Sequence, residues 1–329
     1  MKQEVFERRY SSDWEQFEQW ISLLSKRRSR ADNDPERLQA AGKEFPARYR
    51  EICHHLALAR TRRYSIALQQ RLNQLALDGH QQLYRSRTTF LSTLQAFVFR
   101  EFPATFRRYW RYMLASTLLF YLPAFGMAIA INLQPELVFS FLSPADVSRM
   151  EAMYDPQNDV LGRERVSETD WQMFAYYIYN NITIGFQTFA GGLVFGLGSL
   201  FYLVFNGLFF GAVATHLTAV GYTSTFWPFV AGHSALELTA ICIFGGVGLL
   251  IGYAGIAPGR RSRWHAIRYQ ATNGMPLVYG GVLMLVAAAF VEAFWSSTTW
   301  PPVMLKFVVG GALWLLLLLY FLLMGRHES

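Results

Sequence analysis

Hydrophobic positions divide the chain into two contrasting parts. Up to about residue 112, apolar residues recur three or four positions apart between charged ones, which is the spacing of helices with one buried face. From Met113 onward the chain contains long apolar runs with very few charges. Because a bilayer-spanning helix needs about 20 apolar residues, these runs predict several spans. We therefore expect an all-α fold, a polytopic membrane helix bundle of about six spans with an N-terminal cytosolic helical domain.

Residues 1–87 are predicted to form a cytosolic helical bundle. Ser12 followed three residues later by Glu15 matches a capping box, which marks the start of a helix. Pro35, directly after an aspartate, matches the first position of a second helix. A third amphipathic run follows, with leucines at helical spacing. The three predicted helices cover about 12–28, 35–60 and 64–84.

Residues 88–111 combine aromatic, apolar and basic side chains and predict an interfacial elbow helix. Such a helix lies in the membrane surface, with its aromatic rings toward the acyl chains and its arginines toward the headgroups. We expect Pro103 to break this helix, because proline cannot donate a backbone hydrogen bond. The arginines that adjoin the first apolar run are Arg107, Arg108 and Arg111.

Residues 112–325 are predicted to form the transmembrane bundle. The first span is followed by an acidic segment, 134–170, which we expect to be extracytoplasmic. The run 174–220 is about twice as long as one span and carries no Lys, Arg, Asp or Glu, so it is either a two-helix hairpin or a single tilted helix. The other predicted spans cover about 113–133, 229–257, 275–297 and 304–324.

The charges between the spans predict how the bundle is oriented. Residues 1–112 carry 21 Lys and Arg against 12 Asp and Glu, whereas residues 134–174 carry 3 against 8. By the positive-inside rule, the basic side of the first span is cytoplasmic. Arginines recur at 260–268, and returning them to the cytoplasm requires the hairpin, roughly 172–194 and 198–218. We therefore expect a multi-pass protein of the cell inner (plasma) membrane with both termini cytoplasmic.

The excess of basic residues bears on the choice of partner. The formal net charge is +7, and most of the basic residues lie before the first span. Such a segment can bind nucleic acid, but anionic lipid headgroups also select lysines and arginines next to membrane helices. We therefore expect the lipid bilayer, and no nucleic acid, as its partner. The two cysteines, Cys53 and Cys242, provide neither a disulfide framework nor a cysteine-rich zinc site.

Polar side chains inside the predicted spans are the candidate binding residues. An ionisable residue in the bilayer costs about 2.5 kcal/mol or more, so it needs a partner or a water-lined cavity. Counting about 1.5 Å per residue from the predicted helix ends places most of these groups at similar depth in the outer half of the membrane. The predicted polar intramembrane cluster comprises Asn180, Asn181, Gln187, Asn206, His216, His233, Glu237 and Glu292.

Two interpretations of this cluster stay open. One is a polar cavity, open outward or to the outer leaflet, that binds a ligand. The other is structural: His233 and Glu237, four residues apart, hydrogen-bond each other, and Glu292 either extends to the membrane interface or pairs with Lys306. A catalytic metal would need a third ligand, which His216 or Glu292 could supply, but the sequence reads HSALE rather than the HExxH of zinc proteases. We expect no catalytic residue, no metal and no cofactor.

Glycine pairs recur in the apolar runs. Small residues in a membrane helix allow the backbones of neighbouring helices to approach closely. The pairs therefore favour tight packing within the bundle, and a homodimer is the alternative use of the same faces. The pairs are Gly192/Gly196, Gly207/Gly211, Gly248/Gly252, Gly280/Gly281 and Gly310/Gly311.

Several stretches are distinctive enough to compare with known families. In the membrane half they are YNNITIGFQTFAGGLVFGLGSLFYLVFNGLFFG (179–211), FWPFVAGHSALELTAICIFGGVGLLIG (226–252) and VAAAFVEAFWS (286–296). In the first half they include DWEQFE (13–18), YREICHHLALAR (49–60), LNQLALDGHQQLYR (72–85) and FREFPATFRRYWRYM (99–113). Together they closely resemble the stage II sporulation protein M family of integral membrane proteins, over nearly the whole chain. Family members commonly have glycine where this chain has Ser234.

The resemblance implies a non-enzymatic membrane protein. In spore formers the family's namesake looks like a scaffold that gathers a peptidoglycan-degrading complex. Longer members, which this chain resembles, are often encoded beside an ATPase of the MoxR type and another small membrane protein. The resemblance therefore implies a scaffold or coupling subunit of an envelope-associated membrane complex, with partner membrane proteins and a cytosolic ATPase complex as its expected partners.

Two other functions follow from the residues themselves. A transporter or lipid-moving protein would use a polar cavity containing His233, Glu237 and Glu292, and glycine-rich helices would permit the broken geometry that such proteins use. A metal-dependent membrane enzyme is the less favoured alternative. The Glu237→Gln change separates the first two, because it would abolish substrate movement by a transporter but alter only the stability or the partners of a scaffold.

Overall fold

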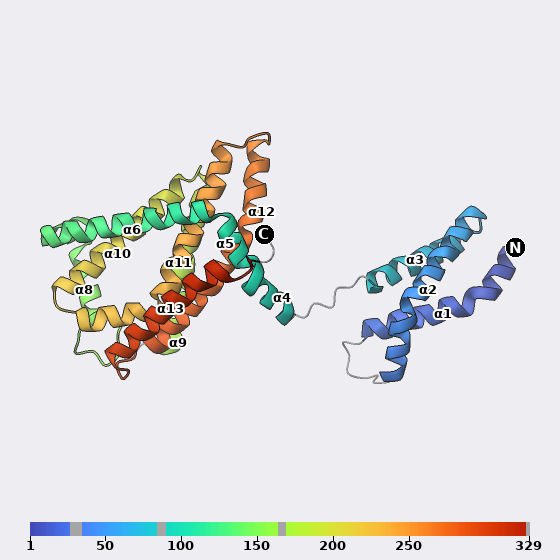
Figure 1. The fold of residues 1–329 in the computed structure, drawn as a ribbon, viewed down its shortest axis with the longest axis horizontal. Helices are drawn as coiled ribbons and strands as arrows, with labels where there is room; N and C mark the ends of the chain where they lie inside the picture. The colour runs from blue at the N-terminus through green and yellow to red at the C-terminus, as the bar shows by residue number, and fades with distance from the viewer. Residues whose placement is uncertain (27–34, 84–89, 164–168, 327–329) are drawn as a thin grey trace. The chain divides into compact units, whose positions relative to one another are not determined.

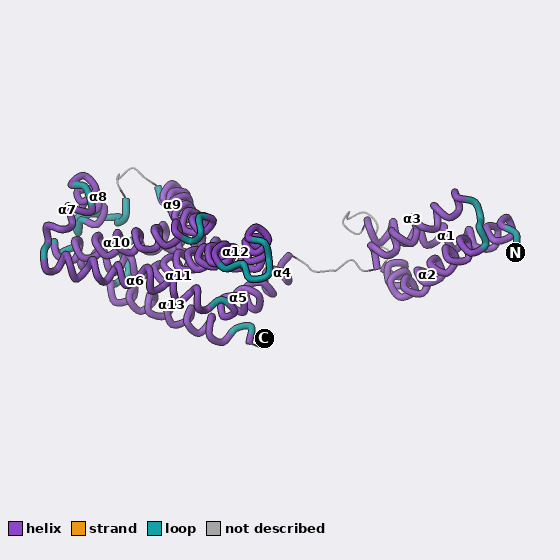
Figure 2. Tube along the Cα trace, turned by 90° about the horizontal axis from the view of Figure 1, so that it is seen from above, coloured by secondary structure: helices purple, strands orange, loops and turns teal. Residues whose placement is uncertain are grey.

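The computed structural model describes residues 1–26, 35–83, 90–163 and 169–326, with the backbone alone described for 23–26 and 35–43. Within these ranges the regular elements are helices, and the one β contact is an isolated bridge between Val160 and Thr298. Figure 2 shows these helices joined by short loops. The chain divides into two units, Met1–Thr89 and Phe90–Ser329. The all-α class predicted from the sequence is confirmed.

The first unit consists of three helices around an aromatic core. Their bounds are α1 Gln3–Lys26, α2 Pro35–Thr61 and α3 Ile66–Leu83 (Figure 1). The largest side chains of the core that are fully buried are Phe6, Trp14, Phe17, Ile52 and Leu72, each at most 2% exposed. Burying each of these side chains contributes about 1.5–3 kcal/mol, so this unit has a hydrophobic core of its own.

The start that the sequence predicts for the first helix is wrong. Ser12 and Glu15 lie inside α1, which already begins at Gln3. The helix extends upstream because Phe6 continues the buried stripe that Trp14 begins and is itself completely buried. The second helix begins at Pro35 as predicted, while the aspartate before it lies outside the described residues. The expected domain boundary at residues 87 and 88 also lies outside them.

One buried histidine belongs to this core. The indole Nε1 of Trp14 donates a hydrogen bond to His55 Nδ1 at 3.1 Å, and His55 is 6% exposed. Because Nδ1 accepts this bond, His55 is held as the neutral imidazole. Burial, followed by the charge of the adjacent His54, lowers the pKa of His55.

The second unit opens with the predicted elbow, but Pro103 does not break it. The elbow is a continuous run of α4 Phe90–Ala96, the π-helix η1 Phe97–Glu101 and α5 Phe102–Arg108. Pro103 lies near the start of α5, and the Val98 carbonyl group, five residues upstream, accepts a hydrogen bond from the Tyr320 hydroxyl group instead. The bend comes at Tyr109 instead, which leaves the helical conformation between α5 and the next helix. Arg107 fixes the elbow by donating to the Phe321 carbonyl at 2.9 Å.

Among the described residues of the second unit, five helices are long and apolar enough to cross a membrane. They are α6 Trp110–Leu133, α10 Leu197–Ala219, α11 Thr223–Ile256, α12 Arg263–Val291 with its π-helical continuation η4 Glu292–Ser296, and α13 Val303–Leu323. The predicted second span, α9 Asp170–Ala190, is as long as α13 but is not in this set. Its amide side chains make it more polar, so its crossing stays a prediction.

The run 174–220 is a two-helix hairpin and not one tilted helix. The chain reverses between α9 and α10 through η3 Gly191–Leu193, and Phe195 and Gly196 adopt positive φ angles of 51° and 83°. Across the turn, Ser199 Oγ donates to the Thr188 carbonyl at 2.6 Å. The positive φ at position 196 explains why a glycine stands there.

Two helix starts differ from the predicted ones. α11 begins at Thr223, upstream of the expected 229, because Phe226 adds another buried turn. α12 begins at Arg263 rather than near 275, so the predicted basic loop is short and two of its four arginines lie on a helix capped by Ser262. The length of an apolar run predicts only the part of the helix that crosses the membrane. The helix itself starts earlier, because helical hydrogen bonding continues into the polar residues that flank the run.

Helix α11 is the centre of the bundle (Figure 1). It packs against α6, α9, α10, α12 and α13, and its glycines let their backbones come close. A side chain at Gly248 would overlap Ser199, and one at Gly252 would overlap Gly196. Gly310 of α13 packs in the same way against the Ala231 carbonyl group of α11. These contacts set the distances between α11 and its neighbours.

The acidic segment folds over one end of the bundle. It contains η2 Pro135–Leu137, α7 Val138–Phe141 and α8 Pro144–Tyr154. Ser143 caps α8 by accepting a hydrogen bond from the Asp146 N–H group. The ring of Tyr154 packs edge-on against Phe226 and Phe229 near the start of α11, with centroids 5.2 and 5.3 Å away. The segment therefore covers the end of the bundle where α11 begins.

The neighbouring glycines of α13 provide a test of this packing. An added Cβ at Gly310 would overlap the Ala231 carbonyl group, whereas one at Gly311 would meet nothing within 4 Å. We expect Gly310→Ala to destabilise the protein by about 1–3 kcal/mol, the usual cost of overpacking. Gly311→Ala should change stability by less than about 1 kcal/mol. Thermal unfolding of both variants in detergent measures the difference, and equal unfolding temperatures would contradict the close contact.

The first unit should lose stability in acid because of His55. Its folded pKa lies below the value of about 6.5 in the unfolded chain, so the unfolded state binds more protons as pH falls below about 6.5. Stability is therefore complete above that pH and declines below it. Circular dichroism melts of the segment 1–89 at about pH 7.5 and about pH 5.5 should show this decline. His55→Gln should weaken it and the exposed His54→Gln should retain it; equal pH dependence in both variants would contradict the assignment.

Candidate functional site

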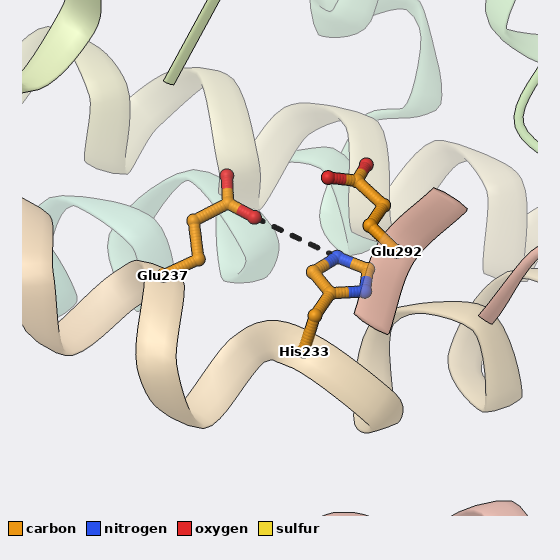
Figure 3. A group of neighbouring side chains, drawn as sticks. All are labelled: His233, Glu237 and Glu292. Carbon is orange, nitrogen blue, oxygen red and sulfur yellow. Dashed lines mark ion pairs between the residues drawn. The ribbon is translucent and has the colours of Figure 1, made fainter. Parts of the chain in front are cut away.

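Three ionisable side chains of the predicted cluster meet inside the bundle. His233 and Glu237 lie one turn apart on α11, and Glu292 begins the π-helical turn η4. One potential ligand atom from each lies within 4.8 Å of the other two. The ion-pair distance between His233 Nε2 and Glu237 Oε2 is 3.7 Å, too long for a hydrogen bond. Figure 3 shows both carboxylate groups on the side of the imidazole that carries this nitrogen.

The π-helical turn η4 determines how Glu292 faces α11. A π-helical turn widens the helix and changes the direction of its side chains, and such turns are frequent at functional sites. Here it brings Ser296 against the backbone of Gly232, where an added Cβ would overlap the Ser296 hydroxyl group. Ser296 Oγ also lies 3.0 Å from His233 Nδ1 in a buried hydrogen bond. This contact fixes the imidazole ring and leaves Nε2 directed at the carboxylates.

These side chains are largely removed from the surface. His233 is 6% exposed, Glu292 is 9% exposed and Glu237 is half-buried. Asn181 of α9, 3% exposed, is a polar neighbour of the Glu292 carboxyl group. Neither Asn181 Nδ2 nor Glu292 Oε2 has a hydrogen-bond partner among the described residues. Unsatisfied buried polar atoms are rare in folded proteins, so these two call for an explanation.

The nearest lysine does not balance the negative charge of the two carboxylates. Lys306 donates hydrogen bonds to the backbone carbonyl groups of Ser296 and Thr298, the first at 2.8 Å. The predicted pairing of Glu292 with Lys306 is therefore wrong, because the carbonyl groups freed at the end of η4 take up the ammonium donors. In the part of the chain that the structure describes, no lysine or arginine pairs with Glu237 or Glu292.

The other predicted residues lie apart from this group or at its edge. Asn180 donates to Asn181 Oδ1 at 3.1 Å and so adjoins the cluster. His216 instead lies 2.7 Å from Glu151 of α8, and Asn206 donates to the Tyr202 carbonyl group of its own helix at 2.7 Å. Gln187 is exposed on α9. Depth in the membrane was predicted from position along each helix, but the direction of a side chain depends on helix rotation, which packing determines.

Sequence reasoning missed two contributors near the site. Ser296, which orients His233, follows Glu292 by four residues, and this spacing is the signal that could have found it. Tyr154 approaches from the acidic segment; burial, followed by the charges of Glu292 and Glu237, raises its pKa. No local pattern identifies Tyr154, because its position depends on how α8 folds back.

A separate apolar groove runs along another face of α11. Its larger section, about 620 Å³, lies between α6, α10, α11 and α13, and a further section of about 250 Å³ continues it past Tyr121 and Trp314. None of the eight predicted cluster residues lines either section. On α11 the groove uses Ser234 and Leu238, each one position after a cluster residue and thus about 100° around the helix.

The buried group is chemically suited to binding a cation or holding protons. It supplies two carboxylates and one imidazole nitrogen, and no basic side chain of the described residues faces them. A cation would satisfy both carboxylates; without one, protons must do so. The same atoms include the nitrogen and oxygen ligands that zinc takes in proteins.

Comparison with known families identifies the family of the chain. A family model described as Stage II sporulation protein M matches residues 113–297, which is more than half of the chain and includes His233, Glu237 and Glu292. A second model, described as Domain of unknown function (DUF8413), matches residues 4–85. No curated protein and no solved structure matches the chain. The chain is a membrane protein that belongs to the stage II sporulation protein M family.

Proposed function

We propose that this protein is a non-enzymatic scaffold or coupling subunit of an envelope-associated membrane complex. The observation that carries this proposal is the apolar groove between α6 and α13. Both helices pack on α11 and expose most of their remaining surface, including Leu122, Ile129 and Leu316. A long groove bordered by two outward-facing apolar helices suits the transmembrane helix of a partner protein.

The N-terminal unit supports a coupling role. It has its own aromatic core and would present charged helices to a cytosolic partner, as an ATPase complex would require. The elbow α4–α5 joins the membrane unit through contacts with the end of α13, including Phe106 stacked on Phe321 at 3.9 Å. A partner bound to the groove next to α13 would therefore act on the helix that anchors the elbow.

The proposed setting is the inner (plasma) membrane, with both termini in the cytoplasm. The elbow lies against the end of α13, so the entry and exit of the bundle are at one end. An even number of crossings produces this arrangement, and the basic segment before α6 orients that end toward the cytoplasm. A homodimer is compatible with it, although only Gly311 of the predicted glycine pairs is exposed and the others pack within the bundle.

A transporter or lipid-moving protein is the second candidate. It is favoured by the three buried ionisable groups on α11 and η4, because such groups in membrane helices commonly mark pathways for ions or substrates. The groove counts against this candidate, since its lining is mostly apolar and includes none of the three groups.

Filling the groove should remove the partner. Ala128 of α6 lines the groove, whereas the next residue, Ile129, is 62% exposed and does not line it. We expect Ala128→Trp to reduce co-purification of partner membrane proteins from native membranes by about tenfold or more, the effect of losing about 1.4 kcal/mol. Ile129→Trp should leave co-purification unchanged. If both variants recover the same proteins in equal amounts, the groove is not the docking surface.

The orientation has a separate test. We expect a cysteine at Ser148, in α8, to react with a membrane-impermeant thiol reagent in intact cells. A cysteine at Ser262, between α11 and α12, should react only after permeabilisation, because it lies on the side of the arginines. Both changes are made in a background without Cys53 and Cys242. Labelling of position 262 in intact cells, with position 148 protected, would reverse the orientation.

A further inference from the structure

The buried cluster has an unbalanced charge. Glu237 and Glu292 face one another across His233, and the described residues supply no lysine or arginine to either. Two carboxylates cannot both stay ionised in a low-dielectric interior without a compensating positive charge. The Lys306 ammonium group, the basic group closest along the chain to η4, is held by backbone carbonyl groups instead. The site therefore requires either a bound cation or added protons.

The geometry of the donor atoms favours a metal ion. One atom from each side chain lies within 4.8 Å of the others, and His233 Nε2 is 3.7 Å from Glu237 Oε2. In a tetrahedral zinc site, with bonds of about 2.0–2.1 Å, neighbouring ligand atoms are about 3.3 Å apart. Small side-chain rotations would bring these three atoms to that spacing. His233 and Glu237 share one face of α11, and Glu292 reaches them from η4 (Figure 3).

The surroundings of the histidine match those of a metal ligand. A metal-binding imidazole usually engages its second ring nitrogen in a hydrogen bond that fixes the tautomer and the ring orientation. Here His233 Nδ1 has that bond, to Ser296 Oγ at 3.0 Å. When Nδ1 donates to the serine, the lone pair of Nε2 points toward the two carboxylates. Lys306 in turn holds the Ser296 backbone carbonyl group, so the supporting residue is itself fixed.

An independent observation comes from Asn181 on the neighbouring helix α9. Asn181 is 3% exposed, and its side chain lies close enough to the Glu292 carboxyl group to stabilise its charge, but Asn181 Nδ2 makes no hydrogen bond of normal geometry among the described residues. Glu292 Oε2 is likewise without a partner. A metal ion with a bound water molecule would satisfy both, because the ion takes the carboxylate oxygen and the water oxygen accepts from the amide.

We propose that His233, Glu237 and Glu292 bind one divalent transition-metal ion of the zinc class, with a fourth position open to water near Asn181. One nitrogen and two carboxylate oxygens suit zinc, whereas calcium takes six to eight oxygen ligands and magnesium takes octahedral oxygen ligands. The ion links α11 to η4 at the point where Gly232 and Ser296 already touch. This inference does not depend on the proposed partner groove.

Metal content of the purified full-length protein tests the proposal. The protein is extracted in detergent, treated with a chelator, incubated with Zn²⁺ and freed of excess ion, and its zinc is measured by mass spectrometry. We expect about one zinc per chain, as the three ligands define a single site. The isosteric variants Glu237→Gln and Glu292→Gln should each retain at least about tenfold less zinc, since an amide is a far weaker ligand than a carboxylate.

A matched control and a second readout keep the result interpretable. His216→Gln removes a part-buried histidine–glutamate contact away from the site, with Glu151, and should leave zinc binding unchanged. Zinc should raise the unfolding temperature of the unmodified protein and of His216→Gln, but not that of Glu292→Gln, because only a folded site binds the ion. Size-exclusion profiles identify any variant that fails to fold. If a glutamine variant fails to fold, Asn181→Ala is measured as well; it keeps all three ligands and should still bind zinc.

Two results would overturn the metal site. One is folded, monodisperse protein that retains no stoichiometric zinc and shows no change in unfolding temperature. The other is equal retention by the unmodified protein and by Glu292→Gln, which would place the ion elsewhere. Both are independent of partner co-purification with Ala128→Trp, so failure of the metal site and failure of the scaffold proposal can be told apart.

Discussion

Close backbone contact with α11 is the constraint on which the membrane unit depends. Lipid tails are as apolar as the helices, so the hydrophobic effect alone does not hold membrane helices together, and packing must do so. Glycines supply that packing: Gly192 and Gly196 bring the α9–α10 turn onto Gly248 and Gly252, and Gly310 brings α13 onto the same helix. With its neighbours at these fixed distances, α11 becomes the most completely buried span of the bundle.

The polar site is a consequence of this packing. Gly232 lets η4 come close enough for Ser296 to reach His233, and the π-helical turn then directs Glu292 at the same point. Burial at that point makes the two carboxylates costly unless a positive charge joins them. The close contact between α11 and η4 thus brings the three side chains together, and their charge then requires the cation of the proposed metal site. Asn181 of α9 completes the surroundings of that site.

The other side of α11 has a different character. There α6 and α13 leave a mostly apolar groove, and both helices expose large apolar side chains on their outward surfaces. The proposed metal site and the proposed partner surface therefore lie on two faces of one helix. The elbow before α6 contacts the end of α13 through Arg107 and Phe106, so the helix that borders the groove also holds the elbow.

The sequence by itself determined the helical class, five of the apolar spans and, within a larger predicted cluster, the three ionisable residues of the site. Apolar run length and charge balance are local properties, and burying Glu237 or Glu292 without a partner is costly wherever the helices lie. Only the tertiary structure decided that His216 turns to Glu151, that Lys306 binds carbonyl groups and that Ser296 and Asn181 complete the site. Helix rotation, the π-helical turn and the fold of α8 determine these directions, and they arise from contacts between distant segments that no local pattern encodes.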